Sequence, residues 1–139
     1  MGNSHSKHFV VENRIEELSS LAEKIDVLAN EWSLSPKITM NVNLAMEEAL
    51  SNIIFYAFPD KNKHEIKILI SLSKSKLTIQ ITDDGVPFNP LSHDSPDITL
   101  HAKERPVGGL GIFLISKIMD DMNYARRKNQ NILTLNKNI

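Results

Sequence analysis

Hydrophobic positions in the first half of the chain repeat with helical spacing. Apolar residues recur at steps of three and four over residues 15–32 and again over residues 38–57, as they do on the buried stripe of an amphipathic helix. Asn13 followed by Glu16 is typical of a capping box at the start of the first helix. Ser35-Pro36 is typical of the start of the second. We therefore predict two consecutive helices.

The period changes to two after residue 65, which predicts strands. Alternating apolar residues over 66–72 and 77–81 flank a polar turn at 73–76, the pattern of an antiparallel hairpin with one solvated side. A short β-prone run at 9–11 precedes the helices. Helical spacing resumes at 110–119, and a second hairpin is predicted to turn at 128–130. This order predicts an α+β fold: a two-layer sandwich with helices on one face of a mixed, mainly antiparallel sheet.

Residues 83–109 lack periodicity and contain four prolines. A loop this long inside a compact domain is typical of a lid or binding loop. The 139 residues suit one domain, 1–139, in which we expect residues 1–7 to form a flexible tail.

Composition excludes several function classes. Sixteen Lys and Arg oppose seventeen Asp and Glu, for a net charge of -1, whereas a general nucleic-acid binder should carry a basic face. The chain has no cysteine, which excludes thiol catalysis and thiolate zinc sites. No apolar run approaches the roughly 20 residues of a membrane span, and the first residues lack a signal-peptide core. We expect a cytoplasmic protein that contacts neither membrane nor nucleic acid.

Two acidic motifs are candidates for chemistry. Glu48 and Asn52 lie four apart on the second predicted helix and therefore share a face. Carboxylate and amide oxygens suit Mg²⁺, and a carboxylate near a hydroxyl can accept its proton. Asp83-Asp84-Gly85 ends a predicted strand, where an acidic acceptor could bind the amine of adenine. The simpler alternatives are a solvated helix stripe and an ordinary Asp-Gly turn.

A third motif is rich in glycine. Gly108, Gly109 and Gly111 precede or begin the third predicted helix. Backbone amides at the positive end of a helix form an anion site suited to phosphates, although a plain hinge would use the same residues. The motif is neither a Walker loop nor a Rossmann fingerprint.

The order of these three motifs resembles the GHKL, or Bergerat-fold, ATP-binding superfamily. Residues 48–52, Glu-Ala-Leu-Ser-Asn, resemble its N box; residues 83–85 resemble its first glycine box; and Gly109-Leu110-Gly111 resembles its second. Within the superfamily, the chain is similar to the bacterial anti-sigma-factor serine kinases in its short length and in this form of the N box.

The resemblance implies a role for each motif residue. Glu48 would be the general base and Asn52 the Mg²⁺ ligand. Asp83 would accept from the adenine amine, and Gly85 would let the base approach. Gly108, Gly109 and Gly111 would hold the phosphates of ATP, under a lid at about 87–107. Thr134 matches a family threonine that supports the adenine through water. Lys103 and Arg105 would add positive charge near the phosphates, or be exposed solubilising charges.

The implied activity is transfer of the ATP γ-phosphate to a serine. The family's partners are a sigma factor and a small anti-anti-sigma protein that carries this serine. A regulatory switch that binds ATP without transferring phosphate and a separated histidine-kinase ATPase domain remain alternatives. Residues of the first helix could also form a homodimer interface, as in the family, or simply pack into the core.

Overall fold

The computed structural model describes residues 4–89 and 109–139. Three helices and five strands occur in these ranges. Their order along the chain is β1 (His5–Glu12), α1 (Glu17–Glu31), α2 (Pro36–Tyr56), β2 (Glu65–Ser73), β3 (Lys76–Asp83), α3 (Gly109–Ile118), β4 (Asp121–Arg127) and β5 (Gln130–Asn138). Each predicted helix and hairpin is present.

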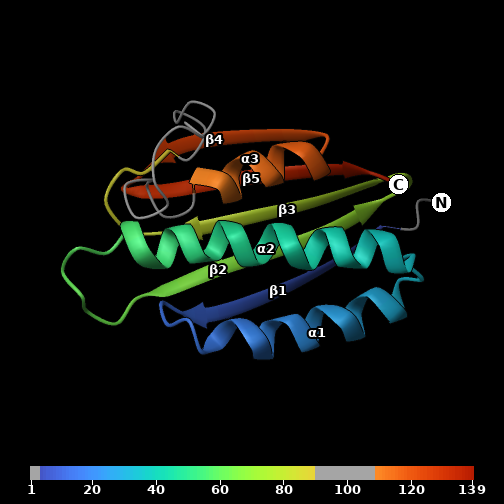
Figure 1. Ribbon diagram of the computed structural model, residues 1–139, viewed down its shortest axis with the longest axis horizontal. Helices are drawn as coiled ribbons and strands as arrows, with labels where there is room; N and C mark the ends of the chain where they lie inside the picture. Colours follow the sequence, from blue (N-terminus) through green and yellow to red (C-terminus); the bar gives the residue numbers. More distant parts are fainter. Residues whose placement is uncertain (1–3, 90–108) are drawn as a thin grey trace.

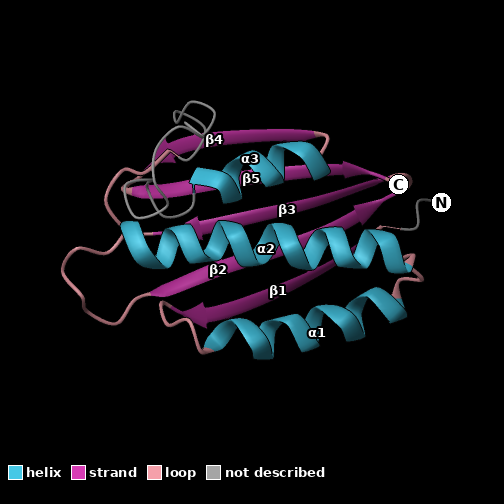
Figure 2. Ribbon diagram, viewed as in Figure 1, coloured by secondary structure: helices cyan, strands magenta, loops and turns pink. Residues whose placement is uncertain are grey.

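The strands form one sheet in the order β1-β2-β3-β5-β4. All four strand pairs are antiparallel, so within the described residues the sheet is antiparallel throughout rather than mixed. The three helices cover one face of this sheet (Figures 1 and 2). The predicted two-layer α+β sandwich is confirmed.

The core lies between the two layers. Inward positions of β2 and β3 alternate as predicted, and Ile66, Ile68 and Ile70 of β2 are at most 1% exposed. Leu21, Ile25 and Leu28 of α1 pack into the same hydrophobic cluster. Full burial of such a side chain contributes about 1.5–3 kcal/mol, which is why the hydrophobic period determines which face of each element turns inward.

The two predicted helix starts have different outcomes. Ser35 caps α2 as expected: its Oγ accepts from the backbone N–H of Ile38 at 3.1 Å, and Pro36 is the first helical residue. The capping box at Asn13 is wrong, because α1 begins at Glu17. The Asn13 side chain instead accepts from the backbone N–H of His64 and donates to the carbonyl of Asn62.

The N-terminal prediction also needs correction. β1 begins at His5, and residues 5–7 pair with β2; the expected flexible tail of residues 1–7 therefore does not extend through them. The side chain of His5 stacks on Trp32, with ring centroids 5.5 Å apart. Pairing and stacking together hold this segment against the domain.

Several chain segments that are distant in sequence meet at one end of the sheet. The C-terminal end of α2, the end of β3, the start of β5 and the start of α3 all lie there (Figure 1). Each of the three sequence motifs is carried by one of these segments. The described helices include none that is long and apolar enough to cross a membrane.

Candidate functional site

Asp83 is a buried carboxylate at the end of β3. Its side chain is on the helix-covered face, and the residue is 2% exposed. Oδ1 accepts from the backbone N–H of Gly85 at 2.8 Å and from Nδ2 of Asn131 at 2.9 Å. None of its hydrogen bonds with the described residues uses Oδ2. One carboxylate oxygen is thus held in place, and the other is available to accept from a ligand.

The pKa of Asp83 is raised. Burial is the main cause, because it penalises the charged carboxylate, and the hydrogen bonds from Asn131 and Gly85 oppose it. Because this carboxylate is desolvated, an additional hydrogen-bond donor that reaches it stabilises its charged form. The exocyclic amine of adenine is such a donor.

Asn131 at the start of β5 is a site residue that the sequence did not reveal. It is 3% exposed and pairs with Asp83 across the β3–β5 ladder. Its Nδ2 donates to Asp83 and to the carbonyl of Val86 at 2.8 Å, and its Oδ1 accepts from the backbone N–H of Phe88 at 3.1 Å. One amide therefore ties the whole turn after β3 to β5. The available signal was an asparagine at an inward position of an alternating strand.

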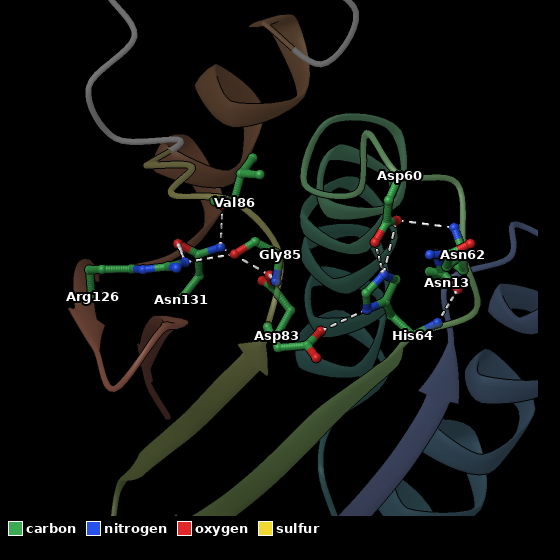
Figure 3. Close-up of polar contacts among 10 residues, drawn as sticks. Asn13, Asp60, Asn62, His64, Asp83, Gly85, Val86, Arg126 and Asn131 are labelled. Atoms are coloured by element: carbon green, nitrogen blue, oxygen red, sulfur yellow. Dashed lines mark hydrogen bonds and ion pairs between the residues drawn. The ribbon is translucent and has the colours of Figure 1, made fainter.

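Two residues of β4 support this amide. Tyr124 donates its hydroxyl to Asn131 Oδ1. Nη1 of Arg126 donates to the same oxygen at 3.2 Å and to the carbonyl of Gly85 at 2.7 Å. Figure 3 shows Arg126 and Asn131 reaching the turn from one side. The turn at 83–86 is thereby fixed from two strands.

Gly85 is required by packing. A Cβ at this position would lie 2.3 Å from the carbonyl oxygen of Ala57 and 2.6 Å from its Cβ. The next residue, Val86, donates its backbone N–H to the same carbonyl at 2.9 Å. Glycine therefore lets the turn after β3 rest on the end of α2. A role of Gly85 in adenine approach stays a prediction.

Thr134 does not join this group. Asn131, Leu133 and Leu135 are the buried, inward residues of β5, and Thr134 alternates with them. Its partner in β3 is Gln80, which alternates with Asp83 in the same way. Thr134 and Asp83 thus lie on opposite faces of the sheet. The adenine role predicted for Thr134 is corrected: Asn131 occupies the position beside Asp83.

The N-box residues lie on α2. Asn52 is 2% exposed, Glu48 one turn earlier is half-buried, and Glu47 is exposed. Glu47 lines the grooves between α1 and α2, whereas Glu48 and Asn52 do not. The two adjacent glutamates therefore face different sides of the helix.

The side-chain amide of Asn52 is a candidate for hydrogen bonding to a ligand. Its Nδ2 is buried and has no hydrogen-bond partner among the described residues. An unpaired buried amide costs about 1–3 kcal/mol, so a polar ligand would be favoured here. The amide's other atom is an oxygen, the donor type that Mg²⁺ takes from few protein ligands plus phosphates and water. The described residues include no cluster of three His, Cys, Asp or Glu that could hold a metal.

The glycine motif is only partly described. Gly109 and Gly111 lie in the first turn of α3, whose N-terminus meets the other motifs at the same end of the sheet (Figure 1). The first N–H groups of this ten-residue helix have no partner within the helix itself, and together with its positive end they favour an anion there. Gly108, Lys103, Arg105 and most of the expected lid at 87–107 lie outside the described residues.

Comparison with known proteins gives one consistent picture. The family described as histidine kinase-like ATPase domain matches residues 11–137. The serine/threonine-protein kinase BtrW of Bordetella bronchiseptica is 29% identical over 108 residues, 78% of this chain and 75% of that protein. The serine-protein kinase RsbW of Bacillus cereus is 30% identical over 110 residues, 76% of this chain and 68% of that protein.

A solved structure shares the fold. In a crystal structure of the RsbU and RsbW domains of a Mycobacterium tuberculosis protein, the matched region covers 96% of this chain and 32% of that one, with a TM-score of 0.66 at 11% identity. The similarity extends across both layers of the sandwich.

Proposed function

The chain belongs to the histidine kinase-like ATPase family, and we propose that it is an ATP-dependent serine protein kinase of the cytoplasm. Its substrate would be a serine on a small anti-anti-sigma partner, and it would also bind a sigma factor. The names of the relatives, serine-protein kinase RsbW and BtrW, support this activity. The observation that supports the proposal is that the end of β3, which carries Asp83, the C-terminal part of α2, which carries Asn52, and the start of α3 lie at one end of the sheet.

Each residue has a distinct task in this proposal. Oδ2 of Asp83 accepts from the adenine amine, and the N-terminus of α3, with Gly108, Gly109 and Gly111, binds the phosphates. The Asn52 amide would hold Mg²⁺, which when bound neutralises charge on the phosphates. Binding at these points orients ATP along α2 with its γ-phosphate towards Glu48. Most of the rate enhancement then comes from positioning.

The transfer step needs a base, and Glu48 is the candidate. The serine hydroxyl gives its proton to the Glu48 carboxylate. The serine oxygen forms a bond to the γ-phosphorus, and the bond between that phosphorus and the β–γ bridging oxygen breaks to leave ADP. A protein that only senses ATP would not require this carboxylate.

The test compares two adjacent glutamates. Glu48→Gln should lower phosphate transfer to a cognate serine partner by roughly 10²–10⁴-fold, the usual contribution of general-base catalysis. Its Mg-ATP affinity should stay that of the wild type, because the shape hardly changes. Glu47→Gln is the matched control and should transfer normally, since Glu47 faces the α1 side.

Labelled ATP and a serine-bearing partner provide the readout. Label on the partner serine supports the kinase, and label on a histidine of the chain itself would support the histidine-kinase alternative. Binding of Mg-ATP with no transfer by the wild type would support the regulatory switch and contradict the kinase. Full transfer by Glu48→Gln would contradict only the role of Glu48.

A further inference from the structure

His64, in the segment between α2 and β2, lies between two carboxylates. Its Nε2 is 2.8 Å from Oδ2 of Asp60 and 3.0 Å from Oδ1, and its Nδ1 is 3.0 Å from Oδ1 of Asp84. A neutral imidazole has one N–H, and only the cation has two. Since carboxylates only accept, both contacts are hydrogen bonds only when His64 is protonated.

The imidazole is held in place independently of the two carboxylates. It stacks on Phe58, with ring centroids 4.5 Å apart and planes 18° from parallel. Its backbone N–H donates to Oδ1 of Asn13 at 2.9 Å, and its carbonyl accepts from the backbone N–H of Asn13 at 3.1 Å. Figure 3 shows His64 surrounded by Asp60, Asn62 and Asn13. The ring therefore has a fixed position between the two carboxylates.

The two carboxylates belong to the two halves of the candidate site. Asp60 follows α2, which carries Glu48 and Asn52, and Asp84 directly follows Asp83. The same two segments touch where Gly85 packs on Ala57. Together these contacts join the end of α2 to the end of β3.

The charges around His64 favour its cation. Asp60 is the largest cause of its raised pKa and Asp84 adds to it, while partial burial opposes both. From the β1 side the facing group is Asn13, which is uncharged. The nearby carboxylate of Glu12 is paired with Arg14 and Lys63 instead. Asp60 and Asp84 are thus the charges that set the state of this ring.

We propose that His64 is a positioning residue of the nucleotide site: as a cation it ties Asp60 to Asp84 and so holds the adenine-binding end of β3 against α2. This inference rests on the proposed ATP site. Loss of the proton leaves one donor, and Asp84, the more distant carboxylate, is released. Because Asp83 and Gly85 flank Asp84, the adenine acceptor then becomes less well ordered.

The predicted effect is on KM for ATP rather than on kcat. From about pH 6 to about pH 9, the wild-type KM should rise by about two- to fivefold, the fold-change that corresponds to an exposed ion pair. His64→Gln and Asp84→Asn should have the higher KM at every pH. The control His8→Gln, an exposed histidine on the outer side of β1, should keep the wild-type profile. Protonation of ATP itself affects the wild type and the three variants equally, so it does not change the comparison.

Two outcomes would overturn the inference. One is a wild-type KM that stays flat over this range, and the other is a His64→Gln variant that keeps the wild-type rise. Thermal melts establish that each variant is folded, and Asp84→Asn provides the same test without altering the ring. Failure of wild-type protein to bind Mg-ATP would instead overturn the proposed function, and the role of His64 with it.

A second measurement does not depend on activity. NMR titration of the His64 ring should give a pKa above the usual value of about 6.5, and Asp84→Asn should lower that pKa. An unshifted pKa in the wild type would contradict the double contact even if ATP binds normally.

Discussion

Asp83 and Asp84 are adjacent in the chain but lie in opposite environments. Asp83 is 2% exposed, and its partners are an amide side chain and a backbone N–H. The side chain of Asp84 is 57% exposed, and its partner is the imidazole of His64. Asp83 is the last residue of β3 and lies on its buried face, whereas Asp84 is the first residue beyond the strand. One motif therefore supplies a desolvated acceptor, to which we assign adenine recognition, and an exposed carboxylate in contact with His64.

The two carboxylates also differ in what their loss should cost. Breaking a buried hydrogen-bond network leaves polar groups without partners, at about 1–3 kcal/mol for each group. An exposed ion pair contributes about 1 kcal/mol or less. Substitutions that leave buried polar groups around Asp83 without partners should therefore affect folding strongly, and substitutions around Asp84 should mainly affect the pH dependence of binding.

The largest effect on stability is expected at the residue that follows both carboxylates. Gly85→Ala places a methyl group 2.3 Å from the carbonyl oxygen of Ala57. Backbone atoms cannot yield as a flexible side chain does, so the free energy of unfolding should fall by about 3 kcal/mol. Urea denaturation measures this loss. Ser75→Ala, in the exposed turn between β2 and β3, is the control. Wild-type stability in Gly85→Ala would show that the turn does not rest on α2.

The next effect is expected at Asn131. Asn131→Ala removes the amide that joins Asp83, the carbonyl of Val86 and the hydroxyl of Tyr124. The free energy of unfolding should fall by about 2 kcal/mol, because these groups lose a buried partner. The control Asn123→Ala lies at an exposed position of neighbouring β4. Equal denaturation midpoints for the two variants would contradict the central place of Asn131.

The smallest effect on stability is expected for Asp83→Asn. An amide oxygen can still accept from Gly85 and Asn131, and the burial of a charge is avoided, so unfolding free energy should change by less than about 1 kcal/mol at neutral pH.

The stability difference between Asp83→Asn and the wild type should also change with pH, in a direction that follows from the raised pKa of Asp83. The pKa of Asp83 is raised above its ordinary 3.8 in the folded protein, so its contribution to stability is greatest at low pH and declines as pH rises towards the folded pKa. Asp83→Asn lacks this decline. Its melting temperature should therefore gain on that of the wild type as pH rises from about 4 to about 7, and a constant difference would contradict the raised pKa.

Local patterns predicted most of the fold. Ser35 and Pro36 specify the start of α2 through contacts within one helical turn, and the alternating residues of β2 and β3 specify their buried faces. Glu48 and Asn52 lie on a helix and Asp83 ends a strand, as their sequence patterns predicted. These features depend on neighbours in sequence, so they can be recognised without a structure.

Features that depend on distant contacts could not be predicted in this way. Asn13 resembles a helix cap, but its side chain binds the backbone of His64, 51 positions away. Thr134 and Asn131 are both polar residues of β5, and only the β3–β5 register shows which one lies beside Asp83. The contacts of His64 likewise depend on how α2 and β3 end in space. Register and chain packing, rather than composition, decide these cases.

The central claim is that Asp83 recognises the adenine of ATP. Calorimetric titration of Mg-ATP into wild-type protein and Asp83→Asn tests it most directly. The wild type should bind one nucleotide saturably, and the folded variant should bind at least about tenfold more weakly, because its amide presents a donor to the adenine amine. Equal affinity of the two proteins, or no binding by the wild type, would contradict the claim.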